Sequence, residues 1–181
     1  MHNCITGSTL PRWLRVVIAT LVGIGLLAAA PDPSQAATVK KSSVSRAAIA
    51  ARMVVVHGRM ERQAVGIAVD KIGDPYRYGA AGPHAFDCSG LTSFALHHAG
   101  FRRVPRTSGA QAQFVHRIHK RNMKVGDLMF FTSGGRVYHV GFFAGWRHHH
   151  RIVLHAPHTG SHVRRQRVWT HHWFAGTLRF R

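Results

Sequence analysis

Cys88 stands directly before Ser-Gly at the start of a helix-like run, in the sequence FDCSGLTSFALHHAG. A cysteine at a helix N-terminus lies at the positive end of the helix macrodipole, which stabilises the thiolate over the thiol. The thiolate is the nucleophile, and the backbone N–H groups of the first turn can stabilise an oxyanion on an attacked carbonyl. These features favour acyl-transfer chemistry at Cys88, although a free cysteine is as commonly a small buried hydrophobe.

A thiolate nucleophile needs a base, and with 16 histidines in the chain only their positions can separate the candidates. His139 lies in the apolar run RVYHVGFFAG, where strand alternation puts it on the same face as Val137 and Gly141. His155 ends the next apolar run, RIVLHAP. If the two runs form a hairpin with WRHHHR at its tip, His155 returns beside His139. It can then hydrogen-bond the distal imidazole nitrogen and fix its tautomer, the role of a third residue in a Cys–His arrangement.

The three consecutive histidines at 148–150 do not predict a metal site. Consecutive residues on a turn point in different directions, and no cysteine or carboxylate lies near them in the sequence. A solvated basic tip is the better interpretation, and the chemistry expected at Cys88 needs no metal or other cofactor.

The N-terminus has the organisation of a secretory signal peptide. Arginines precede an apolar run at 16–30, and small residues at Ser34 and Ala36 suit cleavage. The run is shorter than the roughly 20 residues that a membrane-spanning helix needs, so an uncleaved anchor is the less favoured alternative. We therefore expect residues 1–36 to be removed and the protein to act outside the cytoplasm, at the cell wall or in the periplasm.

Cleavage near Ala36 would remove one of the two cysteines. Cys4 would leave with the signal peptide, and Cys88 would remain as the only thiol, which excludes a disulfide framework within one chain. A lone thiol in an oxidising compartment is a hazard unless it is buried, paired between chains or used. The sequence context favours its use.

The chain is strongly basic, with a formal charge of +19 at pH 7. Removal of the signal peptide leaves 23 basic and 5 acidic residues, a charge of +18. Such a charge implies an anionic environment. Nucleic acid is an unfavoured partner, because the chain carries an export signal and no recognised nucleic-acid-binding motif. Anionic wall polymers or lipid surfaces fit an exported protein better.

The elements that must position Cys88 change along the chain from helical to extended. We expect a flexible leader over 37–45, then helices over RAAIAARMVVVHGRM, ERQAVGIAVDKIG, residues 89–98 and TSGAQAQFVHRI. Five later runs rich in β-branched and aromatic residues predict strands, namely DLMFFT, RVYHVGFFAG, RIVLHAP, HVRRQRVW and FAGTLRF. Helices followed by strands, without βαβ alternation, predict an α+β domain with an antiparallel sheet.

Six blocks in this order resemble the NlpC/P60 family of cell-wall cysteine peptidases: PYRYG, DCSGL, PRTSGAQ, GDLMFF, HVGFFAG and LHAP. The resemblance implies a compact papain-like α+β fold, with N-terminal helices packed on an antiparallel sheet and a nucleophilic cysteine at a helix N-terminus. With the N-terminal features, it implies a signal peptide at 1–36, a basic leader or short helix at 37–60, and a catalytic domain at 61–181.

The resemblance also implies roles for individual residues. It makes Cys88 the nucleophile, His139 the base and His155 the polar residue that orients the base. Tyr76, twelve residues before the cysteine, matches a family tyrosine whose hydroxyl is expected near the oxyanion, although a core aromatic is the simpler alternative.

Asp87 and Ser89 flank the nucleophile and match family positions that line the substrate groove. A carboxylate at position 87 can equally serve as a helix cap that satisfies free N–H groups. Two features depart from the family pattern: the connection at 146–151 is unusually basic, and Ala80 replaces a frequent glycine. Both departures bear on groove shape or wall attachment.

The activity that the resemblance implies is secreted peptidoglycan endopeptidase, which hydrolyses stem-peptide amide bonds, often the γ-D-glutamyl bond to a diamino acid. Two alternatives stay open: a catalytically inactive or latent wall-binding protein on the same scaffold, and an N-acetylmuramoyl-L-alanine amidase or acyltransferase. We expect a monomer that binds peptidoglycan stem peptides, and whose basic surface holds it on anionic cell-wall polymers.

Overall fold

The computed structural model describes residues 33–180, with side chains from residue 45 onward. Most of the predicted signal peptide, residues 1–32, lies outside the described residues. The chain divides into two units, Met1–Val39 and Lys40–Arg181, and the described part of the first is helical. The functional features below belong to the second unit.

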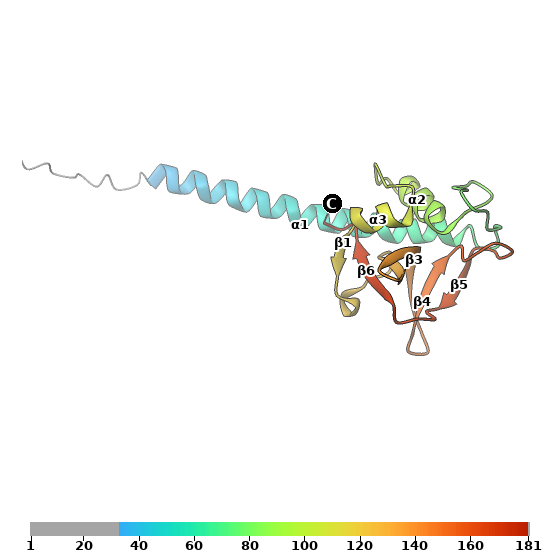
Figure 1. Cartoon of the computed structure of the whole chain (residues 1–181). Helices are drawn as coiled ribbons and strands as arrows, with labels where there is room; N and C mark the ends of the chain where they lie inside the picture. The colour runs from blue at the N-terminus through green and yellow to red at the C-terminus, as the bar shows by residue number, and fades with distance from the viewer. Residues whose placement is uncertain (1–32, 181) are drawn as a thin grey trace, which may run out of the picture. The chain divides into compact units, whose positions relative to one another are not determined.

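Helix α1 runs without a break over Pro33–Val69 (Figure 1). The predictions of a flexible leader at 37–45 and of two separate helices after it were therefore wrong. A proline suits the first turn of a helix, and no glycine or proline occurs again before Gly58. Small polar residues at 37–45 therefore do not end the helix. The chain leaves it through Gly73, whose φ is 99°.

Six strands form one antiparallel sheet in the order β1-β6-β2-β3-β4-β5. Their bounds are β1 His116–Ile118, β2 Leu128–Ser133, β3 Arg136–Arg147, β4 His150–His155, β5 Arg164–Arg167 and β6 Trp173–Thr177. The remaining helices are α2 Cys88–His98, α3 Ser108–Phe114 and the short 3₁₀ helix η1 Lys120–Asn122. The predicted α+β class with an antiparallel sheet is confirmed.

One predicted helix ends earlier than expected. The run TSGAQAQFVHRI is helical only to Phe114, because Val115 turns to an extended conformation and the next residues form β1. β1 pairs with β6, with His116 opposite Thr177. Pairing with a strand some sixty residues away outweighs local helix propensity here.

The sheet buries side chains on both faces. On β2, Leu128 and Phe130 join the larger core, whereas Met129 and Phe131 join a smaller cluster on the other face, as strand alternation requires. The larger core takes apolar side chains from α2, α3 and the C-terminal part of α1, which lie together on one side of the sheet (Figure 1). This packing holds the start of α2 against β3.

A buried ion cluster ties α1 to the C-terminal end of β6. Arg179 NH1 lies 2.7 Å from Asp127 Oδ1 and 3.1 Å from Glu61 Oε2, and Glu61 Oε1 accepts from the Thr177 hydroxyl at 2.8 Å. Burial raises the pKa of Glu61, while its hydrogen bonds and Arg179 oppose that rise. Because each charge has partners, the cluster is compatible with burial and fixes α1 to the sheet.

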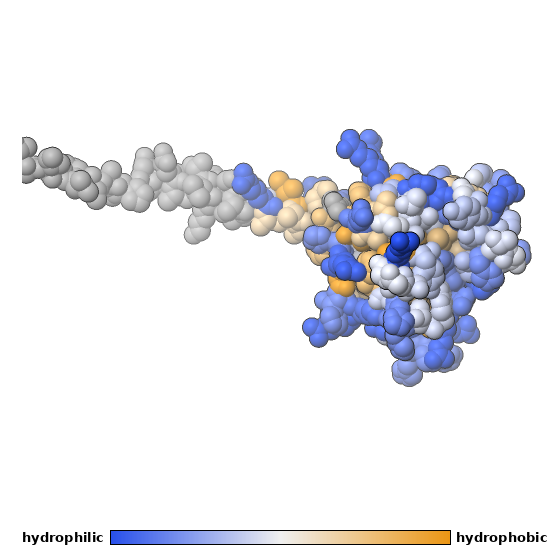
Figure 2. Space-filling model, viewed as in Figure 1, coloured by the Kyte–Doolittle hydropathy of each residue, from blue (hydrophilic) through white to orange (hydrophobic). Residues whose placement is uncertain are grey.

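Further toward its N-terminus, the described part of α1 exposes apolar side chains, visible in orange in Figure 2 against the mostly hydrophilic surface of the rest of the visible face. They include Ile49, Met53, Val55 and Val56. Within the described residues, no helix has the length and apolar character needed to cross a membrane.

Candidate active site

Cys88 is the first residue of α2, and Asp87 caps the helix. Asp87 Oδ1 accepts the Gly90 N–H at 2.6 Å, and Oδ2 accepts the Gly79 N–H at 2.9 Å. A Cβ atom on Gly90 would lie 2.0 Å from the carbonyl oxygen of Ala80, so only glycine lets this loop pass so close to the helix. The DCSG sequence thus fixes both the cap and the loop beside Cys88.

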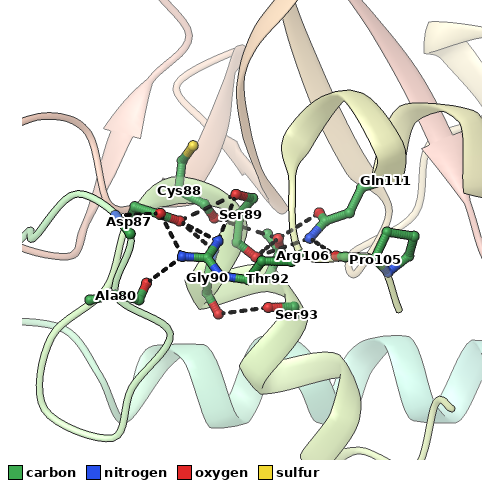
Figure 3. Close-up of polar contacts among 11 residues, drawn as sticks. Ala80, Asp87, Cys88, Ser89, Gly90, Thr92, Ser93, Pro105, Arg106 and Gln111 are labelled. Carbon is green, nitrogen blue, oxygen red and sulfur yellow. Dashed lines mark hydrogen bonds and ion pairs between the residues drawn. The ribbon is translucent and has the colours of Figure 1, made fainter. Parts of the chain in front are cut away.

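Arg106 closes a polar network on one side of the helix start (Figure 3). Its NH1 and NH2 groups donate to the two oxygens of Asp87 at 3.0 and 2.7 Å, and NH1 also donates to Ser89 Oγ at 3.1 Å. The Ser89 hydroxyl itself donates to Asp87 at 3.2 Å. Burial opposes ionisation of Asp87, but Arg106 and the two N–H donors hold its pKa below the usual value.

This network defines what Asp87 and Ser89 do in the structure. Both line a cavity beside Cys88, but their polar atoms bind each other and Arg106. The helix-capping alternative for Asp87 is confirmed. Sequence reasoning missed Arg106, which is one of 25 lysines and arginines and carries no local signal beyond its place in the PRTSGAQ block.

Gln111 holds the loop of Arg106 against α2. Its side chain is fully buried, and Nε2 donates to the carbonyl oxygens of Pro105 at 2.8 Å and Ser89 at 3.0 Å. Oε1 accepts from the Thr92 hydroxyl at 2.7 Å. Gln111, the last residue of PRTSGAQ, therefore positions Pro105 and Arg106 at its start.

His139 lies on β3, and His155 ends the neighbouring strand β4, as the hairpin prediction required. Both side chains are buried. Gly141 makes their approach possible, because a Cβ atom there would lie 2.5 Å from Val153 Cγ2 and 2.9 Å from His155 Cβ. The glycine after HV is thus a steric requirement of the paired histidines.

The two imidazoles belong to a hydrogen-bonded chain. His139 Nε2 lies 2.7 Å from His155 Nδ1, and His155 Nε2 lies 3.2 Å from Gln166 Oε1. Arg164 donates to the same Gln166 oxygen through Nε and NH2, each at 3.1 Å. Two guanidinium donors identify that amide atom as the oxygen, because a guanidinium has no acceptor for an amide N–H. Sequence reasoning missed both Gln166 and Arg164.

This chain determines the tautomer of His139. The Gln166 oxygen accepts a hydrogen bond from His155 Nε2–H, so the proton of the neutral His155 ring stays on Nε2 and Nδ1 has the lone pair. That lone pair accepts a hydrogen bond from His139 Nε2–H, so His139 Nδ1 carries the lone pair that can act as a base. Cys88 and His139 line the same cavity, so a base at Nδ1 is available in the cavity that contains the thiol.

Burial governs the charge state of the three groups. It lowers the pKa of His139 to about 4 and that of His155 to about 3. It also raises the pKa of the Cys88 thiol, although the backbone N–H of Val140 and contacts with Ser89 oppose that rise. The expectation of a stabilised thiolate is therefore corrected, because burial outweighs the local donors. The resting pair at neutral pH is a neutral thiol and a neutral imidazole.

Cys88 lies where two cavities meet, of about 440 and 450 Å³. Tyr76, Cys88 and Tyr138 line both. The first cavity also contains His139 and His155, and the second contains the network of Asp87, Ser89 and Arg106. All six predicted site residues therefore line one or both of these two cavities.

Tyr76 is held at this junction by its backbone. Its N–H donates to the Ser161 carbonyl at 2.8 Å, and it forms an isolated bridge with Phe86. Burial, followed by the neighbouring Cys88 and Asp87, raises the pKa of the phenol, so the hydroxyl stays protonated at neutral pH and can donate a hydrogen bond. In the described residues, no group of three or more His, Cys, Asp or Glu side chains is arranged to hold a metal ion.

Comparison with known proteins adds information about ancestry. The profile of the NlpC/P60 family matches residues 73–181. A probable endopeptidase of Corynebacterium glutamicum is 40% identical over 123 residues, which are 68% of this chain and 55% of that protein. A γ-D-glutamyl-L-lysine dipeptidyl-peptidase of Bacillus subtilis is 34% identical over 95 residues, 51% of this chain and 30% of that protein. The chain thus spans about half or less of these relatives.

Among solved structures, the NlpC/p60 domain of the peptidoglycan hydrolase SagA is similar to this chain with a TM-score of 0.58. It is 30% identical, and the match covers 65% of this chain and 98% of that domain.

Proposed function

Because the chain belongs to the NlpC/P60 family of peptidoglycan hydrolases and endopeptidases, we propose that it is a secreted cysteine endopeptidase that hydrolyses amide bonds in peptidoglycan stem peptides. The observation that carries the proposal is the orientation of His139 by His155, with His139 Nδ1 left as a base in the cavity that contains Cys88. Cys88 is the nucleophile, His139 the general base and acid, and His155 the orienting residue.

The reaction begins from neutral Cys88 and neutral His139. As Cys88 Sγ attacks the amide carbonyl, His139 Nδ1 takes the thiol proton. The tetrahedral oxyanion accepts hydrogen bonds from the Cys88 backbone N–H and the Tyr76 hydroxyl. The imidazolium then gives its proton to the departing amine, and the C–N bond breaks to leave a thioester.

Hydrolysis of the thioester repeats these steps with water. His139 takes a proton from water as the oxygen attacks the thioester carbonyl. Collapse of the second tetrahedral intermediate breaks the C–S bond, and the proton returns to sulfur. The carboxylic acid product leaves, and the resting thiol and imidazole are regenerated. Asp87, Ser89 and Arg106 shape the second cavity and hold the start of α2.

The bond that we propose is the one between the γ-carboxyl of D-glutamate and a diamino acid. The Bacillus subtilis relative, whose name specifies γ-D-glutamyl-L-lysine, supports this bond class. We also propose export through the signal peptide at 1–36, a catalytic domain at 61–181, and a monomer retained on anionic wall polymers. The charge of +18 that remains without residues 1–36 supports the last point and does not by itself imply nucleic-acid binding.

Product identification tests this function. Wild type and Cys88→Ala are incubated with purified peptidoglycan and with soluble L-Ala-γ-D-Glu-meso-diaminopimelate, and the products are identified by mass spectrometry. A cysteine-dependent cut after D-glutamate supports the proposal. Cleavage at the lactyl amide identifies an amidase instead. Retained wall binding without any product identifies a wall-binding or latent scaffold.

A further inference from the structure

A third cavity, of about 510 Å³, shares Trp169 with the cavity that contains His139 and is otherwise lined by different residues. We call it the tryptophan–cation groove after the residues that characterise its wall, namely Trp146, Trp169, Trp173, Lys120, Arg151 and Arg167. Three of the chain's four tryptophans therefore line one groove. Part of its wall comes from the basic connection between β3 and β4 that departs from the family pattern.

Aromatic faces hold two of the cations in place. The Arg151 guanidinium carbon lies 4.4 Å from the ring centre of Trp146, and Lys120 Nζ lies 4.1 Å from that of Trp173. Cation–π contacts of this kind position a charge without neutralising it. Arg151 Nε is moreover buried and has no hydrogen-bond partner among the described residues.

The groove contains no counter-charge. No aspartate or glutamate is among the described residues that line it, and the ion pairs among the described residues are formed elsewhere, by Arg106 and Arg179. Burial and the adjacent charge of Arg151 lower the pKa of Lys120. Three uncompensated cations on a concave surface select an anionic ligand.

The tryptophans indicate that the ligand also has flat apolar faces. Trp146 is 57% exposed and Trp169 is 44% exposed, values that are unusual for the largest aromatic side chain. The C–H groups on one face of a pyranose ring are slightly positive and pack well on the negative face of an indole. A chain of sugar rings fits both the spacing of several indoles and an open groove.

We propose that the tryptophan–cation groove binds an acidic polysaccharide, a chain of sugar rings that carries carboxylate or phosphate groups. Sugar rings stack on Trp146 and Trp169, and the acidic groups pair with Lys120, Arg151 and Arg167. Since Trp169 also stacks on His155, with ring centres 5.3 Å apart, a polysaccharide in this groove lies next to the catalytic cavity. Binding there does not require any bond to be cleaved at Cys88.

The test measures binding to the full chain by tryptophan fluorescence at fixed salt. The acidic probes are peptide-free peptidoglycan glycan strands, which carry free lactyl carboxylates, and a phosphate-bearing wall polysaccharide. Chitohexaose supplies sugar rings without charge, and poly(glycerol phosphate) supplies charge without sugar rings. None of these probes contains a stem peptide, so the outcome is independent of the proposed peptidase activity.

We expect saturable binding of at least one acidic polysaccharide, and the two acidic probes distinguish carboxylate from phosphate as the source of charge. Trp146→Ala and Arg167→Ser, both at exposed positions, should each weaken that binding about tenfold. Arg102→Ser, which removes the same charge at an exposed site outside the groove, should leave it within about twofold. Circular dichroism checks that each variant is folded.

Three results would overturn the proposal. The first is the absence of saturable binding to both acidic polysaccharides. The second is equal weakening by Arg102→Ser and Arg167→Ser, which would mean diffuse charge attraction rather than a site. The third is equally tight binding of poly(glycerol phosphate) or chitohexaose, which would remove the need for rings or for charge.

Discussion

His139 Nε2 lies 2.7 Å from His155 Nδ1, and this contact decides which nitrogen of His139 can act as a base. The tautomer of His139 depends on residues that do not contact it. Arg164 orients the Gln166 amide, whose oxygen fixes the proton on His155 Nε2. Each hydrogen bond in this series fixes which nitrogen of the next imidazole carries the proton. The lone pair of His139 is therefore on Nδ1. Catalysis in this account therefore depends on two polar residues of β5 as well as on the histidines.

Gln166→Leu should lower kcat about tenfold with little change in KM, because one hydrogen bond that fixes the tautomer is lost. Gln166→Glu keeps an acceptor for both His155 and Arg164 and should restore most of the activity. Gln113→Leu, at an exposed glutamine of α3, is the matched control. Steady-state kinetics on the tripeptide measures the effect. Equal activity of wild type and Gln166→Leu would show that the glutamine does not position the base.

The pH profile should report a base with an unusually low pKa. Burial lowers the pKa of His139 to about 4, so the neutral imidazole persists well below the usual histidine range. As the pH falls through about 4, His139 becomes protonated and can no longer accept the thiol proton. The acidic limb of kcat/KM should therefore lie near pH 4 rather than near the ordinary histidine value of about 6.5. A limb at pH 6 to 7 would contradict the buried state described for His139.

Gly141→Ala should damage both stability and activity. The added methyl group would meet Val153 at 2.5 Å and His155 at 2.9 Å, so β4 and the imidazole it carries must shift. Overpacking of this kind costs about 1–3 kcal/mol of unfolding free energy. Gly109→Ala is the control, because a Cβ atom there has no neighbour within 4 Å on helix α3. Urea unfolding followed by activity assays compares the two, and equal tolerance would refute the steric argument.

The sequence predicted the paired histidines for a simple reason. Two apolar strands joined by a polar tip form a hairpin, and the alternation of side chains puts His139 and His155 within reach. Arg106, Arg164 and Gln166 could not be predicted in the same way. They act through hydrogen bonds that only the folded chain brings together, and a basic polar strand gives no signal for which side chain turns inward.

Two other differences arise from competition between local and tertiary effects. The helix N-terminus favours a thiolate at Cys88, but burial, which a sequence does not reveal, has the larger effect on its pKa. The residues at 37–45 are small and polar, but they contain no helix breaker, so α1 continues through them. In the first case the surroundings of the residue decided the outcome, and in the second case small polar composition alone did not predict an end to the helix.

Arg106→Met should reduce kcat/KM, because Arg106 holds the start of α2. It should also lower the free energy of unfolding by about 1 kcal/mol, a small loss because the ion pair with Asp87 is partly exposed. Asp87 has a lowered pKa in the folded chain, so its contribution is present at neutral pH and is lost as the pH falls below about 4. The difference in unfolding free energy between wild type and Arg106→Met should therefore become smaller below about pH 4. Arg102→Met serves as the control, and a difference independent of pH would argue against the Asp87 contact as its cause.

The central claim is that Cys88 and His139 perform amide hydrolysis together. The most direct measurement is the rate of tripeptide cleavage by wild type, Cys88→Ala and His139→Ala, each with matched circular dichroism spectra. We predict that both substitutions abolish cleavage, lowering kcat by at least about a thousandfold, and that the double variant is no slower than either single variant. Residual cleavage by folded Cys88→Ala at a rate near that of wild type would contradict the account.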